Sequence, residues 1–302
     1  MIFLKESLDL DANHSAHPLM ITDKCPEVFK IIRLLSGAVE IVMPREGEEE
    51  EDKIVVAHKN YIRPDQQINN ENSSLLVSYI FDEAPEQQDF RNIALHARGR
   101  NPSFYKSLCD ELSLCVFSTE CDRYTEAFLF LYRALERMSA ACPLIYTSRQ
   151  NDFRSAHDFL SGLYKDKKSP GELGLLRNFL VEYSKGSPNF NAATLDIPIS
   201  NWGGDFATEL ARQWRDVIQR EAAFATIDSE TGIITCPYPK VASLIVTMRN
   251  RSFHNLSGQK NLDLFRLKGA EPVFSVFVPY FLQWTAHVFL DFARWQISSI
   301  RL

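Results

Sequence analysis

The stretch YTEAFLFLYRALERMSAA, from Tyr124 to Ala141, carries the most regular helical pattern in this chain of 302 residues. Its apolar residues recur every three or four positions and line one stripe of a helix, which further apolar positions widen. Few charges interrupt the stripe, and polar groups on so apolar a helix must lie at an edge or be paired. The stretch therefore predicts a helix at the centre of a helical bundle.

Helical periodicity continues around this stretch, from about residue 103 to the last residues. A long irregular connection is expected over 186–202 and a short strand or turn over 232–239. The last helix is apolar, but Pro279, Gln283 and His287 interrupt it, so a buried helix is favoured over a membrane span. Besides the central one, the expected helices cover 104–114, 152–164, 172–183, 206–224, the segment around 244–254, and 273–297.

The first hundred residues follow a different pattern. A helix that starts at Pro26 precedes a strand over 38–42, and further strands are predicted over 54–57 and 75–81. The acidic run EGEEEED, Glu46 to Asp52, is expected to be a solvated surface loop. The fold class is therefore mainly α, with a smaller mixed α+β domain over 1–102 before a helical domain over 103–302.

Composition limits the class of protein. Hydrophobic residues make up 45% of the chain and charged residues 24%, which is typical of a folded soluble protein. The net charge of −6 argues against a protein that coats nucleic acid indiscriminately, although it allows a local basic cleft. The N-terminus has acidic residues where a signal peptide needs a basic start, so a cytoplasmic location is expected.

Several kinds of site are disfavoured. The six cysteines form no Cys-x-x-Cys pair, which favours reduced buried thiols over zinc or redox sites. Glycine-rich phosphate loops, Gly-x-Ser-x-Gly and His-Glu-x-x-His are absent. His14 and His17 lie close together but have no evident third ligand. We therefore predict neither a metal site nor a cofactor.

The stretch LIVTMRNRSFHN, from Leu244 to Asn255, contains the residues that best fit a reaction. An arginine pairs with phosphate oxygens at any working pH, and a histidine is suited to moving protons near neutral pH. Together they suffice to cleave RNA without a metal. The histidine handles the 2′-hydroxyl or leaving-group proton, and the arginine stabilises charge on the phosphorus oxygens. Arg249, Asn250 and His254 are therefore the candidate catalytic residues.

The spacing of these residues adds a constraint. On one helix Asn250 and His254 share a face, whereas Arg249 and His254 lie about 140° apart round the axis. Arg249 therefore reaches the histidine if its side chain wraps round the helix, if the helix ends there, or if a second copy of the segment supplies it. The third possibility predicts a composite site across a symmetric homodimer.

These features resemble the HEPN superfamily. Its pattern is an arginine, four to six residues and a histidine, often with a polar residue after the arginine. Arg249, Asn250 and His254 match it, after a long helix that carries Ala134-Leu135-Glu136. The resemblance covers roughly 116–302. It implies an up-and-down helical bundle, a homodimer that brings two motifs together, and metal-independent endoribonuclease activity.

The same resemblance implies a biological setting. Many members of the superfamily are toxins or abortive-infection effectors, so antiphage defence is expected, with residues 1–102 sensing or restraining the activity. A partner protein from a defence system is compatible with this setting. The RNA sequence that would be cut does not follow from the residues.

Two supporting residues are open to more than one interpretation. Glu136 either pairs with Arg133 or Arg137, or orients His254 or Arg249 from a facing helix. Arg251 either supports the site or is a solvated surface charge.

A second Arg-Asn-x-x-x-His runs from Arg91 to His96. It follows the proline- and acid-rich segment 84–89, and no long apolar helix precedes it, so Arg249 and His254 are favoured as the functional copy. The other possibilities are that the second copy acts, that both act or that neither does. The alternative function is a non-catalytic HEPN-like module that binds RNA or a protein, with His254 at a helix end as a capping residue.

Overall fold

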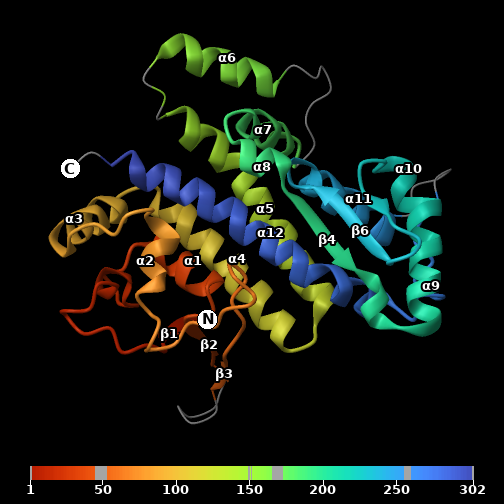
Figure 1. Cartoon of the computed structure of the whole chain (residues 1–302), viewed down its shortest axis with the longest axis horizontal. Helices are drawn as coiled ribbons and strands as arrows, with labels where there is room; N and C mark the ends of the chain where they lie inside the picture. Colours follow the sequence, from red (N-terminus) through yellow and green to blue (C-terminus); the bar gives the residue numbers. More distant parts are fainter. Residues whose placement is uncertain are drawn as a thin grey trace. The chain divides into compact units, whose positions relative to one another are not determined.

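The computed structural model describes residues 2–44, 53–148, 150, 152–164, 173–254 and 260–300. Of the residues that the structure describes, 61% are helical and 9% lie in strands, with two small antiparallel sheets, so the mainly helical class is confirmed (Figure 1). The acidic run from Glu46 to Asp52 lies outside the described residues.

The chain divides into two compact units. The first comprises Met1–Asp122, Leu129–Ala134 and Thr285–Leu302, and the second comprises Arg123–Phe128 and Leu135–Trp284. The long helices α5 (Tyr124–Thr147) and α12 (Ala270–Ser298) contribute residues to both units. The first unit thus extends beyond the expected boundary at residue 102, because α4 (Pro102–Glu120) packs against α1 (Glu27–Leu35).

The first unit contains one three-stranded antiparallel sheet in the order β1-β2-β3. Phe3 lies opposite Val42, and Ile41 lies opposite Val56. The predicted helix after Pro26 and the strands near 38–42 and 54–57 are confirmed. The other elements of this unit, besides α1 and α4, are β1 (Phe3–Glu6), η1 (His17–Leu19), β2 (Val39–Met43), β3 (Ile54–Val56), α2 (Leu75–Ile80) and α3 (Gln87–Arg98).

The turn after α1 depends on a glycine. Gly37 has a φ of +69°, and a Cβ there would lie 2.9 Å from the carbonyl oxygen of His58. A side chain at this position would therefore both strain the backbone and collide with the neighbouring segment. The close approach allows the N–H of Tyr61 to donate to the carbonyl of Leu35 at 2.8 Å.

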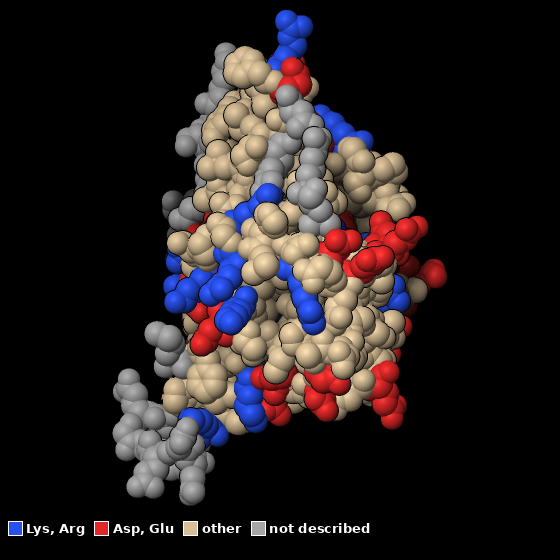
Figure 2. Space-filling view, turned by 90° about the vertical axis from the view of Figure 1, so that its left-hand side faces the viewer, with Lys and Arg blue, Asp and Glu red and all other residues tan. Residues whose placement is uncertain are grey.

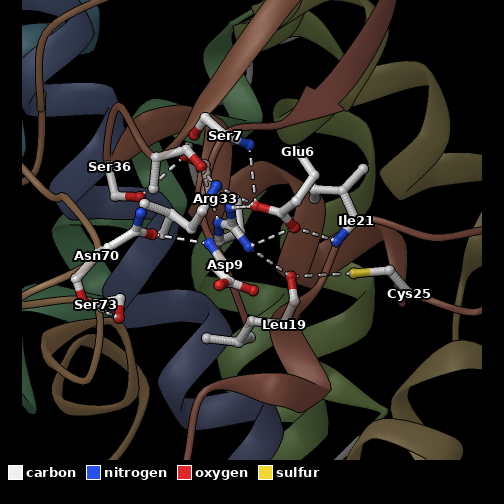
Figure 3. A network of polar contacts seen from close by, with 12 residues as sticks. Glu6, Ser7, Asp9, Leu19, Ile21, Cys25, Arg33, Ser36, Asn70 and Ser73 are labelled. Carbon is white, nitrogen blue, oxygen red and sulfur yellow. Dashed lines mark hydrogen bonds and ion pairs between the residues drawn. The ribbon is translucent and has the colours of Figure 1, made fainter. Parts of the chain in front are cut away.

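Arg33 of α1 is fully buried and joins three segments of the first unit (Figure 3). Its guanidinium pairs with Glu6 of β1 and donates to the carbonyls of Leu19, at 3.0 Å, and Ala38, at 3.2 Å. Burial by itself would raise the pKa of the Glu6 carboxyl, but the hydrogen bond and charge of Arg33, together with the N–H groups of Ile21 and Leu8, lower it. This ion pair therefore connects the edge strand to the helix behind it.

The end of α12 that belongs to the first unit is tied to it by polar contacts. The Nε2 of His287 lies 2.8 Å from the carbonyl oxygen of Ile62, and Arg294 donates to the carbonyls of Ser78 and Tyr79, at 2.6 Å each. Among the described residues α12 is one helix long and apolar enough to cross a membrane, but 72% of its most apolar window is buried inside the protein. The interpretation of α12 as a core helix, which the sequence favours, agrees with this burial.

The second unit combines helices with a sheet in the order β4-β6-β5, in which Leu195 lies opposite Cys236. The helix expected over 206–224 is interrupted, since α9 passes into a π-helical turn, η4, and then into α10. The elements, besides parts of α5 and α12, are α6 (Phe153–Leu163), α7 (Gly174–Lys185), α8 (Pro188–Ala192), β4 (Thr194–Pro198), η3 (Ile199–Trp202), α9 (Gly204–Gln213), η4 (Trp214–Ile218), α10 (Gln219–Glu221), β5 (Thr226–Ile227), β6 (Ile233–Pro237), η5 (Tyr238–Lys240) and α11 (Val241–Phe253).

Two expectations about secondary structure are wrong. Residues 75–81 were expected to form a strand, but they form α2, because a short apolar run fits a buried helix as well as a strand. The connection over 186–202 is not irregular, since it contains α8, β4 and η3. Consequently residues 103–302 are not purely helical: a sheet lies among them.

Buried His58 predicts a loss of stability in acid. Burial lowers its pKa to about 4, although its 2.6 Å contact with the Leu34 carbonyl acts in the opposite direction. An unfolded histidine titrates near 6.5, so the unfolded chain gains a proton that the folded chain excludes. The stabilisation is therefore complete above pH 6.5 and is lost as the pH falls towards 4, by about 2–3 kcal/mol at pH 4.5.

Urea unfolding between pH 7.5 and 4.5 would measure this loss. In His58→Gln, which keeps a donor near the Leu34 carbonyl, the fall in stability should be smaller than in the parent by about 2 kcal/mol. His157→Gln, at an exposed position on α6, should fall as the parent does. Equal slopes in the parent and His58→Gln would contradict the prediction.

Candidate active site

Helix α11 presents the candidate catalytic residues at its C-terminal end. Its buried side, which includes Leu244, Ile245 and Met248, belongs to the core of the second unit. The helix ends at Phe253, and His254 follows in an extended conformation with φ −105° and ψ 117°. Of the three possibilities that the spacing allowed, a helix that ends before the histidine is therefore realised.

An aromatic stack fixes this end of α11. The ring of Phe253 stacks on that of Phe274 with centroids 5.4 Å apart and an interplanar angle of 5°. Phe274 of α12 in turn stacks on Phe128 of α5 at 4.3 Å. Stacked aromatic pairs contribute about 0.5–1.5 kcal/mol each beyond their buried area. The backbone of His254 is thus attached to a rigid support, while its own side chain is exposed.

The three candidate catalytic residues lie within six positions of one another in the chain. Arg249 and Asn250 lie in the last turns of α11 and are half-buried, and His254 is exposed just beyond the helix. The N–H of His254 donates to the carbonyl of Asn250 at 3.2 Å, which closes the last turn. Arg249 is engaged by other groups of the protein and is not a free surface cation.

Arg251 is not the solvated charge that one interpretation of the sequence expected. It is only 3% exposed and pairs with Glu221 of α10, with Nε 2.8 Å from a carboxylate oxygen. It also donates to the Lys260 carbonyl at 3.3 Å, and its own carbonyl accepts the N–H of Leu262 at 2.9 Å. Arg251 therefore connects α11 to α10 through an ion pair, and to the segment at 260–262 through hydrogen bonds.

The supporting residue Glu136 lies on α5 and is half-buried. Arg133, one of its two expected partners, instead pairs with Glu111 at 2.8 Å. Helices α5 and α11 meet at the aromatic stack, through Phe128 and Phe253. From that stack, Glu136 lies eight residues, or about 12 Å, along α5, and Arg249 lies about 6 Å along α11. Both Glu136 and Arg249 are engaged in interactions within the fold.

The second Arg-Asn-x-x-x-His lies on α3 and does not bring its two residues to one cleft. Arg91 lines a cleft and donates to the carbonyl of Ala12 at 2.8 Å. His96 is exposed, does not line that cleft, and has Nδ1 2.8 Å from the carbonyl oxygen of Asn92. The second motif therefore has its arginine in a cleft that its histidine does not line.

The buried cysteine thiols are expected to be unreactive. All six are free; Cys121 is half-buried and the others are buried, as the sequence led us to expect. Burial raises the pKa of the thiols of Cys25, Cys109 and Cys236 to about 12. In the part of the chain that the structure describes, no group of three or more His, Cys, Asp or Glu side chains could hold a metal ion.

Sequence reasoning missed an aromatic side chain in the turn that follows α11. Phe265 is 95% exposed, and Arg266 and Lys268 beside it are exposed as well. The turn is held by hydrogen bonds, including one from the N–H of Gly269 to the carbonyl of Leu264 at 2.7 Å. The sequence signal that could have identified it is an aromatic residue next to a cation, Phe265-Arg266, in the short segment between two helices.

Comparisons of this chain with models of protein families, with curated proteins and with solved structures found no match.

Proposed function

We propose that the protein is a metal-independent endoribonuclease that uses Arg249, Asn250 and His254. The observation that carries this proposal is the end of α11, where an exposed imidazole follows directly on a turn that carries an arginine and an amide. The aromatic stack under Phe253 supplies the rigid support that a catalytic group needs.

The chemistry requires only these groups and the RNA itself. The imidazole of His254 accepts the proton of the 2′-hydroxyl, the 2′-oxygen bonds to phosphorus, and the bond from phosphorus to the 5′-oxygen breaks. The leaving 5′-oxygen takes up a proton from an imidazolium or from water. Arg249 stabilises the charge on the phosphorane, and Asn250 orients the reacting groups. The products carry a 2′,3′-cyclic phosphate and a 5′-hydroxyl.

The turn after α11 supports an RNA substrate. Phe265 offers an exposed ring on which a base can stack, a contact worth about 1–3 kcal/mol. Lys260, Arg266 and Lys268 are exposed in the same segment of the chain, although Arg266 also pairs with Asp263 at 3.3 Å. These cations provide the local basic surface that the acidic net charge of the chain allows.

The wider setting belongs to the same proposal. The resemblance to the HEPN superfamily favours an up-and-down arrangement of the helices in 103–302 and a homodimer that joins two Arg/His motifs. It also favours a toxin or antiphage-defence role in the cytoplasm, with residues 1–102 restraining the activity or meeting a defence partner.

A second candidate is a non-catalytic module that binds RNA or a protein. The observation in its favour is that Arg249 is half-buried and already engaged within the fold, as a structural arginine would be. In that case His254 serves only to end α11.

Incubation of mixed RNAs with the purified parent, His254→Ala and His96→Ala separates the two candidates. The parent should cut RNA equally with and without EDTA, and His254→Ala should lose activity by about a thousandfold. His96→Ala, with the same change at the second motif, should cut as the parent does. Cleavage by His254→Ala at the parental rate would show the assignment to be wrong, and a parent that binds RNA without cutting it would favour the binding module.

A further inference from the structure

A second candidate site lies in the first unit, between α3 and the segment around η1. It is a cleft of about 640 Å³, and its walls come from residues 17–25 and from one face of α3. Figure 2 views the side on which α3 lies and shows Lys and Arg side chains gathered there. The proposed nuclease residues on α11 have no part in this cleft.

Part of the lining of the cleft is cationic. Among the described lining residues, Lys24, Arg91 and Arg98 carry positive charge and Asp23 supplies the one carboxylate, which leaves a net charge of +2 in a chain whose total is −6. Within the described residues, neither Lys24 nor Arg98 forms an ion pair. The side chain of Arg91 is held in place by its bond to the carbonyl of Ala12 at 2.8 Å. These three cations therefore carry an excess of positive charge that a bound anion would neutralise.

Both sides of the cleft also carry apolar residues. Pro18, Met20, Ala94 and Leu95 line the cleft, and Leu95 is 69% exposed although it is a large apolar residue. Arginines and apolar residues alternate on one face of α3, at positions 91, 94, 95 and 98.

The opposite face of α3 fixes the helix. Phe90, Ile93 and Ala97 are buried there, and the ring of Phe90 packs edge-on against Phe29 of α1 with centroids 5.8 Å apart. The cleft therefore has a preformed wall that carries both positive charge and an uncovered apolar surface.

We infer that this cleft binds a small organic phosphate, a molecule with one or more phosphate groups on an aromatic or aliphatic body of about nucleotide size. The volume falls in the range of about 300–1,000 Å³ that is typical of small-molecule sites. Guanidinium groups match phosphate oxygens in pairs, and the apolar lining residues would cover the body of the ligand. The segment that leads into α3 exposes Asp82, Glu83 and Glu86, which disfavours a long polyanion such as RNA.

Calorimetric titration of the full chain tests the inference. The probes are AMP, ATP and 1-naphthyl phosphate, with inorganic phosphate and adenosine as the anion alone and the body alone. We expect at least one of the three organic phosphates to bind one per chain with a Kd below about 100 μM, at least about tenfold tighter than either fragment. Binding of AMP and ATP without 1-naphthyl phosphate would identify the body as a nucleoside. No binding of any organic phosphate, or equal binding of inorganic phosphate, would overturn the inference.

Substitutions of the lining residues test whether the organic phosphate binds in this cleft. Arg91→Gln/Arg98→Gln should weaken it by at least about tenfold, whereas Arg63→Gln/Arg154→Gln, with the same change of charge at exposed positions, should leave it within about twofold. Leu95→Glu places a carboxylate at an exposed position of the cleft, where the fold tolerates it, and should also weaken binding. Parental affinity in both cleft variants would overturn the inference. These results are independent of RNA cleavage, so this site and the proposed nuclease can fail separately.

Discussion

Equimolar mixing of Arg249→Ala chains with His254→Ala chains is expected to restore about one quarter of the parental RNA cleavage, although each variant alone is nearly inactive. In a composite site the arginine comes from one chain and the histidine from its partner. A mixed dimer then holds one site with both native residues and one with neither. Since half of the dimers are mixed after random exchange and each has one intact site of two, a quarter of the sites are active.

The experiment decides a question that the end of α11 leaves open. Because the helix ends at Phe253, His254 is no longer bound to the helical angle that separates it from Arg249. The mixture would stay inactive if each site lay within one chain, so the measurement distinguishes that arrangement from a shared site. Dimers would be exchanged by co-expression of differently tagged chains, and sedimentation would check their state. A matched control mixes His254→Ala chains with Arg249→Ala/His254→Ala chains, which can form no intact site. No recovery in the test mixture, from variants that still dimerise, would exclude the shared site.

Replacement of Arg33 by methionine is expected to destabilise the fold by about 3–5 kcal/mol. The change leaves Glu6 without its cation and the carbonyls of Leu19 and Ala38 without their donor. A loss of this size is a large part of the total stability of a typical domain. Urea unfolding at pH 7.5, followed by circular dichroism, measures it.

Two further variants show that the loss comes from the ion pair. Arg63→Met, at an exposed arginine of the same unit, should cost less than about 0.5 kcal/mol. Arg33→Met/Glu6→Leu removes both charges and should recover part of the loss, because the N–H groups of Leu8 and Ile21 that donate to Glu6 then lose their acceptor. The pKa of Glu6 is lowered in the fold, so its contribution is present above the ordinary carboxyl pKa and is lost as the pH falls through the folded value. The difference between the parent and Arg33→Met should therefore shrink in acid, and a constant difference would contradict this account.

The long helices could be predicted from the sequence, because their periodicity depends on local order. The stripe of α5 and the apolar run of α12 repeat over many turns, which gives an unambiguous period. The run at 75–81 is too short for its periodicity to distinguish a strand from a helix. Packing in the first unit favours the helix, α2. The strand β4 was missed because its partner β6 follows almost forty residues later, with Leu195 opposite Cys236.

The same distinction applies to the candidate sites. The residue types of Arg249, Asn250 and His254 are visible in the sequence, and so is their proximity. The burial of Arg251 is not, because its partner Glu221 lies thirty residues earlier in the chain. The cleft beside α3 could not be predicted either, since residues 17–25 and 91–98 meet only in the folded first unit.

The buried thiols offer a way to observe the two compact units separately. Cys25, Cys109 and Cys115 belong to the first unit, and Cys142 and Cys236 belong to the second. Each is protected both by its surroundings and by a raised pKa, so an alkylating reagent reacts with it only when the surrounding structure opens. Mass spectrometry of the alkylated peptides would then time the opening of each half of the molecule, with no label other than the native cysteines.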